Sequence, residues 1–133
     1  MGDLDGRVAV VTGGAKGIGR AISLRLAKDG AAVSVWDLDG DGANDTVSEI
    51  GKAGGRAIAC VGDAASSRSI AGFVERTHAE LGPVTILINN AGITGFIDFQ
   101  QITEELWDRM IAINLKGPYL CSQAIIPDML AAG

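Results

Sequence analysis

The chain has 133 residues, of which 47% are hydrophobic and 20% charged, and its formal net charge is −5. This composition indicates one folded globular domain spanning residues 1–133 and argues against a disordered chain. The negative balance disfavours nucleic acid or an anionic membrane surface as the main partner, and no apolar run approaches the roughly 20 residues of a membrane span.

Short apolar runs alternate with helical patterns along the chain. Runs rich in valine and isoleucine occupy residues 7–11, 32–36, 57–61 and 84–88. Continuous apolar runs are typical of strands buried on both faces of a parallel sheet. The helical patterns between them end at glycines, and Ser66 is a candidate N-cap of the third. The alternation predicts an α/β fold with a doubly wound parallel sheet.

A fourth helical pattern begins after Thr103, a candidate N-cap, and continues to the end of the chain. Pro118 and Pro127 lie inside it, which predicts a break or kink at each proline. A parallel sheet usually continues with another strand after such a helix. The fold is therefore expected to be truncated after the fourth strand and fourth helix.

Three glycines, Gly13, Gly17 and Gly19, stand between the first predicted strand and the first helix. A turn without side chains lets the backbone approach a diphosphate, whose charge the amides of a helix N-terminus can bind. Gly19 can also allow close packing of helix on strand. The spacing differs from the common G-x-G-x-x-G, and an ordinary strand–helix turn that happens to contain glycine is the alternative.

Acidic residues follow the next two predicted strands. Asp37 ends the second strand, 18 residues after Gly19, where a carboxylate can accept hydrogen bonds from ribose hydroxyls. Because Asp39 and Asp41 follow closely, a solvated loop acid is the competing interpretation. Asp63 follows the third strand and is expected at the same edge of the sheet as Gly13 and Asp37, where open α/β sheets bind ligands.

The segments TGGAKGIG (residues 12–19) and NNAG (residues 89–92) together closely resemble the short-chain dehydrogenase/reductase family, and the resemblance covers essentially the whole chain. It implies a Rossmann-type sheet, a nicotinamide dinucleotide cofactor, a small alcohol or carbonyl substrate, and a homo-oligomer. It assigns no metal, and gives Asn89 a structural role. The residues that it assigns to cofactor binding are Thr12, Gly13, Lys16, Gly17, Ile18, Gly19, Asp37, Leu38, Asp63, Ala64, Asn90, Ala91 and Gly92.

The resemblance also makes Asn114 a catalytic residue. Helical hydrogen bonding would join its carbonyl to residue 118, but Pro118 has no N–H. The carbonyl is then free to hold a water in a proton relay. A proline kink that only shapes the helix is the alternative interpretation.

The family's catalytic serine and Tyr-x-x-x-Lys pair have no match in this sequence. Tyr119 is the only tyrosine, and Gln123 stands four residues later. Without a Tyr–Lys pair, hydride transfer lacks its partnered proton transfer. The chain thus resembles the N-terminal half of such an enzyme and is expected to be inactive alone. The alternatives are a fragment that only binds dinucleotide or assembles, and a flavodoxin-like or receiver-type module, in which the glycine turn would have no role.

The cofactor is expected to be NAD in preference to NADP. Asp37 would repel a 2′-phosphate, and Leu38 offers it no positive charge. Lys16 favours the opposite choice, because a basic residue there often accompanies NADP in the family.

The cysteines, the tryptophans and the single histidine are expected to have structural roles. Cys60 and Cys121 stand alone in apolar segments and are expected to be buried free thiols. Together with the lack of a signal-type leader, this predicts a cytoplasmic protein. Trp36 and Trp107 are expected to pack in the interior and His78 to lie on a solvated helix face.

Overall fold

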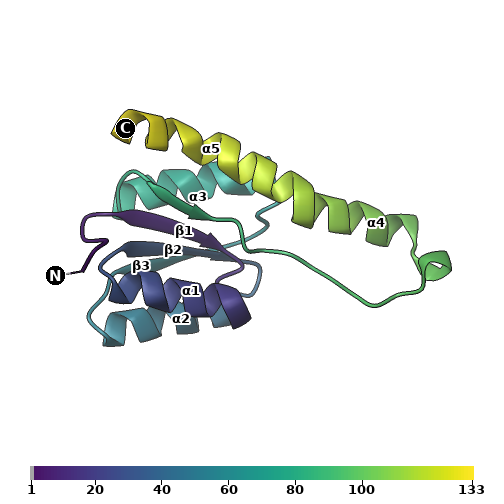
Figure 1. Ribbon diagram of the computed structural model, residues 1–133, viewed down its shortest axis with the longest axis horizontal. Helices are drawn as coiled ribbons and strands as arrows, with labels where there is room; N and C mark the ends of the chain where they lie inside the picture. Colours follow the sequence, from purple (N-terminus) through teal and green to yellow (C-terminus); the bar gives the residue numbers. More distant parts are fainter. Residues whose placement is uncertain (1) are drawn as a thin grey trace.

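The computed structural model describes residues 2–133 as one parallel sheet covered by helices on both faces (Figure 1). The strands are β1 (Val8–Thr12), β2 (Ala32–Asp37), β3 (Ala57–Val61) and β4 (Ile86–Ile88). They lie in the order β3-β2-β1-β4, with every pair parallel. The expected doubly wound α/β fold is confirmed.

Helices α1 (Gly17–Lys28) and α2 (Gly40–Lys52) cover one face of the sheet, and α3 (Ser67–Glu80) and α5 (Gly117–Ala132) cover the other. Successive strand residues point to opposite faces, so each strand contributes to two cores. Val10 packs in the core under α3 and α5, whereas Val11 packs in the core under α1 and α2. Burial on both faces explains why the strand sequences are continuously apolar.

The fourth strand is shorter than the apolar run that predicts it. Residues 84–88 form the run, but the strand begins at Ile86. The Val84 amide donates to the carboxylate of Asp128 on α5, over 2.9 Å, and the Thr85 amide donates to the Val8 carbonyl of β1, over 3.0 Å. The apolar run therefore contacts α5 at Val84 before it pairs with β1. In the described sheet, β4 is an edge strand.

Two of the helix starts follow from their caps. The hydroxyl of Ser66 accepts a hydrogen bond from the Ser69 amide at the start of α3, and that of Thr103 accepts from the Leu106 amide at the start of α4 (Glu104–Ile111). Both caps are the predicted ones. Asp39 caps α2 through the Gly42 amide, a role that its place in an acidic loop does not reveal.

Of the break or kink that the sequence predicts at Pro118 and Pro127, a break occurs at neither proline. A π-helical turn, η2 (Ala112–Lys116), joins α4 to α5, and the helical path is continuous (Figure 1). In this turn the Gly117 amide donates to the Ala112 carbonyl, five residues back, so Pro118 lies in the first turn of α5, where its missing N–H is tolerated. Pro127 lies on an exposed side of α5, where water can reach the freed carbonyl.

The two tryptophans lie in different environments. Trp36 is fully buried, as expected, with its ring centroid 5.2 Å from that of Phe73 and its indole N–H donating to the Ser34 hydroxyl. Trp107 is 59% exposed, against expectation, because α4 extends beyond the sheet (Figure 1). Within residues 2–133, no helix has the length and apolar character needed to cross a membrane.

Candidate functional site

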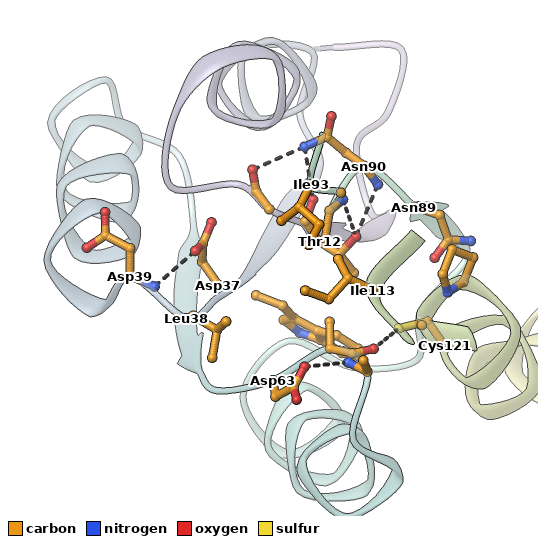
Figure 2. Close-up of a pocket in the computed structure, with 18 of the residues that line it drawn as sticks. Thr12, Asp37, Leu38, Asp39, Asp63, Asn89, Asn90, Ile93, Ile113 and Cys121 are labelled. Carbon is orange, nitrogen blue, oxygen red and sulfur yellow. Dashed lines mark hydrogen bonds between the residues drawn. The ribbon is translucent and has the colours of Figure 1, made fainter. Parts of the chain in front are cut away.

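A cavity of about 660 Å³ opens where the carboxyl ends of the four strands meet (Figure 2). The chain leaves β1 toward β2 and β3 on one side and returns to β4 on the other, so this edge is the topological switch point of the sheet. The wall opposite the glycine turn comes from α4 and α5. The fold therefore brings together segments distant in sequence.

Most of the residues predicted for cofactor binding line this cavity. They are Thr12, Gly13, Lys16, Gly17, Ile18, Asp37, Leu38, Asp63, Ala64, Asn90, Ala91 and Gly92. Gly19 and Asn114 are not among the lining residues, and their places are described below. Ile18 is 74% exposed and lines the cavity at the first turn of α1.

The glycine turn has the geometry that an anion-binding helix start requires. Gly13 and Gly17 have φ of +68° and +57°, values that favour glycine. A Cβ on Gly17 would meet nothing within 4 Å, and the N-cap residue Lys16 forms no side-chain cap. The start of α1 therefore has open space beside Gly17 and no side-chain cap competing for its first amides, which fits a diphosphate.

Gly19 shapes the turn from behind. A Cβ at this position would lie 2.0 Å from the Gly13 carbonyl oxygen and 2.4 Å from Nδ2 of Asn90. The Gly19 carbonyl in turn accepts from the buried hydroxyl of Ser23, over 2.9 Å. Its absent side chain lets α1 approach β1, the packing role that the sequence suggests.

Two backbone amides fix the carboxylate of Asp37. Oδ2 accepts from the Ala15 amide over 3.0 Å, and Oδ1 accepts from the Asp39 amide over 2.9 Å. Figure 2 shows the side chain at the end of β2, beside the cavity. Since each carboxylate oxygen has two lone pairs, acceptor capacity remains for ribose hydroxyls. Asp37 is thus an oriented anion, unlike a freely solvated loop acid.

The Thr12 hydroxyl joins the end of β1 to the segment after β4. It accepts from the amides of Asn90 and Ala91, over 3.1 and 3.0 Å. The Asn90 side chain reaches back and donates to the carbonyls of Thr12 and Gly13 (Figure 2). The NNAG segment and the glycine turn therefore form one hydrogen-bonded unit. Asn89 lines the cavity and also donates to the Ser122 hydroxyl on α5.

Asn114 lies on the π-helical turn and ties down the loop after β4. Its Oδ1 accepts from the Ile93 amide and its Nδ2 donates to the Ile93 carbonyl, each over 2.8 Å. The side chain is therefore engaged with the backbone beside the cavity. The catalytic role assigned to Asn114 and the water on its carbonyl stay predictions.

Sequence reasoning missed the cavity wall formed by α4 and α5. Arg109, Ile113 and Cys121 line it from this helical stretch. Gly117 permits the approach, because a Cβ there would lie 3.1 Å from the Ala64 carbonyl oxygen. The glycine before Pro118 is the one sequence feature that could have indicated this close approach of the helix. Because the sequence predicts a break or kink at Pro118, the stretch is not expected to form a wall of the cavity.

The two cysteines are buried and free, as expected. Burial raises the pKa of the Cys121 thiol to about 11, so it is neutral near pH 7. Its Sγ lies 3.6 Å from the Ala64 carbonyl. Among the described residues, no group of three or more His, Cys, Asp or Glu side chains is placed to hold a metal ion.

The sheet order and the glycine turn at its switch point define a Rossmann-like α/β fold. The chain matches the family model for short chain dehydrogenases over residues 7–133, and it belongs to that family.

Three comparisons show what the chain is similar to. It is 38% identical to (2S)-[(R)-hydroxy(phenyl)methyl]succinyl-CoA dehydrogenase subunit BbsD of Thauera aromatica, covering 92% of this chain and 49% of the relative. It is 39% identical to D-threitol dehydrogenase of Mycolicibacterium smegmatis, covering 98% and 50%. A metagenomic short-chain oxidoreductase solved in complex with NADP superposes with a TM-score of 0.91 at 40% identity, covering 97% and 59%.

The chain spans about half the length of the curated relatives that it matches. The fold of this family binds NAD or NADP, and the relatives named here are dehydrogenases or oxidoreductases.

Proposed function

We propose that residues 1–133 are the cofactor-binding part of an NAD-dependent oxidoreductase that acts on a small secondary alcohol or ketone. When bound, the nicotinamide would supply or accept the hydride. We also propose that the parent protein is a cytoplasmic homo-oligomer. The dehydrogenase names of the similar proteins support the reaction class, and the chain's own residues support the cofactor.

The residues divide by the part of the dinucleotide that each would hold. The first-turn amides at Gly17 and Ile18 would bind the diphosphate, because they face the cavity at the positive end of α1. Asp63 would lie beside the adenine, from its place after β3. The segment of residues 90–92 would line the nicotinamide side, where Asn90 holds the glycine turn.

The observation that carries the preference for NAD is the fixed carboxylate of Asp37. Both of its oxygens are held by backbone amides, so the charge cannot easily turn away from a 2′-phosphate. Repulsion would then penalise NADP, whereas the 2′-hydroxyl of NAD would donate a hydrogen bond. Lys16 also lines the cavity and favours NADP, and the similar metagenomic protein was solved with NADP. The fixed anion is the stronger argument, because it lies at the end of β2 where the ribose would bind.

Calorimetric titration of the chain with NAD and with NADP tests this proposal. We expect Asp37→Ala to weaken NAD binding about ten- to hundredfold, the usual effect of losing hydrogen bonds to a charged group, and to weaken NADP much less. Asp45→Ala is the matched control, because Asp45 is exposed on α2 and does not line the cavity. Equal affinity of the native chain for both dinucleotides would refute the NAD preference.

A second candidate function is dinucleotide binding or assembly without turnover. The absence of a Tyr-x-x-x-Lys match in the sequence favours it for this chain, since Gln123 stands where the lysine would follow Tyr119. Turnover of NAD with a panel of secondary alcohols separates the two functions. We expect the 133-residue chain to bind NAD and to show no turnover, and measurable turnover would overturn the expectation that it is inactive alone.

A further inference from the structure

Behind the glycine turn, α2 carries a threonine that does not touch the cavity. Thr46 is fully buried, and its Oγ1 lies 3.0 Å from the Gly14 carbonyl oxygen and 3.1 Å from that of Gly42 in its own helix. Arg20 of α1 donates to the same hydroxyl over 3.3 Å and also pairs with Glu49. Because the arginine donates to the oxygen, the hydroxyl hydrogen is left for a carbonyl, and those of Gly14, Gly42 and, at 3.5 Å, Ala15 lie within reach.

The segment that Thr46 holds is also the segment that holds Asp37. Gly14 precedes Ala15, and the Ala15 amide donates to Oδ2 of Asp37. The other carboxylate oxygen accepts from the Asp39 amide, and Asp39 caps α2, the helix that carries Thr46. These contacts form a closed ring that runs from the turn to the end of β2, through α2, and back to the turn.

Close packing leaves this ring little freedom. A Cβ on Gly14 would lie 2.7 Å from Cγ1 of Val35, and a Cβ on Gly42 would lie 3.0 Å from Cβ of Ala15. The turn is therefore pressed between β2 and the start of α2. Within this contact, the Thr46 hydroxyl lies at hydrogen-bond distance from the carbonyl of the peptide that joins Gly14 to Ala15.

We propose that Thr46 is a positioning residue for cofactor choice: by holding the Gly14 carbonyl it sets the Ala15 amide, which in turn orients the Asp37 carboxylate. This inference rests on the proposed binding of NAD at the same site. Loosening Asp37 would weaken its hydrogen bond to the 2′-hydroxyl of NAD. It would also relax the repulsion of a 2′-phosphate, so NADP would lose less affinity than NAD.

Calorimetric titration of Thr46→Val and Thr46→Ser with NAD and NADP tests this role. Valine keeps the shape of threonine and removes the hydroxyl, so we expect NAD affinity to fall about fivefold, the effect of one hydrogen bond, and the NAD to NADP preference to shrink. Serine keeps the hydroxyl and should bind NAD within about twofold of the native chain. If the valine variant does not fold, Thr46→Ala makes the same comparison.

Thr77→Val is the matched control for a merely structural effect. Thr77 is equally buried on α3, and its hydroxyl contacts the Ser34 hydroxyl and the Phe73 carbonyl, away from the cavity lining. We expect this variant to lose stability while the folded protein keeps its NAD to NADP ratio. A similar change of ratio in Thr77→Val, or an unchanged ratio in Thr46→Val, would overturn the proposal.

Amide hydrogen exchange at Ala15 gives a readout that needs no cofactor. We expect faster exchange at Ala15 in Thr46→Val than in the native chain or in Thr46→Ser, and unchanged exchange would contradict the positioning role. If the native chain binds neither dinucleotide, the proposed function fails, and the Ala15 exchange alone decides whether Thr46 orders the turn. The two failures are therefore distinguishable.

Discussion

The glycines of the first turn differ in what their missing side chains allow. At Gly17 the space is open and lies toward the cavity, so the absent Cβ leaves room for a ligand. At Gly19 the space is filled by the backbone of Gly13 and the side chain of Asn90, so the absent Cβ lets the protein pack against itself. One motif therefore contains a ligand-facing glycine and a packing glycine.

We expect Gly19→Ala to destabilise the chain by about 1–3 kcal/mol, the usual cost of overpacking, and to weaken dinucleotide binding. The added methyl would lie 2.0 Å from the Gly13 carbonyl oxygen, so the turn must move. Urea unfolding and NAD titration check both effects.

Gly72→Ala is the matched control for this prediction. Gly72 lies inside α3, and a Cβ there would meet nothing within 4 Å. The substitution should stabilise the chain by about 0.5–1 kcal/mol, because alanine has a higher helix propensity than glycine. If Gly19→Ala were as stable as the native chain, the packing role of Gly19 would be wrong.

Among the elements, α3 and α5 are joined by a carboxylate. Asp128 on α5 accepts from the Val84 amide over 2.9 Å and from Nε2 of His78 on α3 over 2.6 Å. His78 is thus engaged with α5 and not only solvated. Burial by itself would raise the pKa of Asp128, but the Val84 and His78 hydrogen bonds and the histidine charge outweigh it, and they lower the pKa.

We expect Asp128→Ala to lower the free energy of unfolding by about 1–3 kcal/mol near neutral pH, because it removes hydrogen bonds to a charged, partly buried group. A carboxylate with a depressed folded pKa stabilises above its unfolded pKa of about 4 and loses this effect as the pH falls through the folded value. The difference between variant and native chain should therefore shrink below about pH 4.

Urea unfolding across this pH range measures the effect. Glu80→Ala is the control, since Glu80 pairs with Arg76 at the surface of α3 and such a pair contributes little. A destabilisation by Asp128→Ala that stays constant down to pH 2 would show that packing, and not the carboxylate charge, is lost.

The π-helical turn holds the loop after β4 through one side chain. The Asn114 amide group makes both hydrogen bonds to Ile93. We expect Asn114→Ala to speed hydrogen exchange at the Ile93 amide by about tenfold or more, because the amide loses its partner and the loop is released. Exchange at Ile93 that is the same in the variant and the native chain would refute this anchor.

Ser122→Ala serves as the control for that measurement. Its hydroxyl accepts from the side chain of Asn89, four residues before Ile93, whereas both hydrogen bonds to Ile93 come from Asn114. Slow exchange at Ile93 should therefore persist in this variant.

At the scale of the molecule, the helical stretch α4–α5 exposes several large apolar side chains. Trp107, Leu115, Tyr119 and Leu130 are all exposed along it, and β4 forms an edge of the described sheet. An open strand edge and exposed apolar side chains both favour association. We expect the 133-residue chain to self-associate as its concentration rises, and analytical ultracentrifugation measures this.

Leu115→Lys should weaken that association, because it places a charge in the apolar stretch, whereas Lys52→Glu on the exposed end of α2 should not. A chain that remains monomeric at high concentration would contradict the prediction. If Leu115→Lys leaves the association unchanged, the association would be assigned to the edge of β4.

The sequence by itself determined the order of strands and helices, the switch-point edge and most of the cavity lining. These follow from local rules: apolar runs predict buried strands, and the glycines, Ser66 and Thr103 mark turns and caps. The positions of Gly13, Asp37 and Asn90 around one cavity follow from the parallel topology, because the carboxyl ends of all parallel strands meet at one edge.

The tertiary structure alone decided how α4 and α5 join and what stands behind the site. Proline rules predict a break at Pro118, but a π-helical turn shifts the hydrogen bonding by one residue and carries the helix onward. Likewise, nothing near Thr46 in sequence reveals that its hydroxyl reaches the Gly14 carbonyl, 32 positions away. Such contacts depend on how α2 packs beside the glycine turn. Local sequence patterns do not show which residues far apart in the chain will meet.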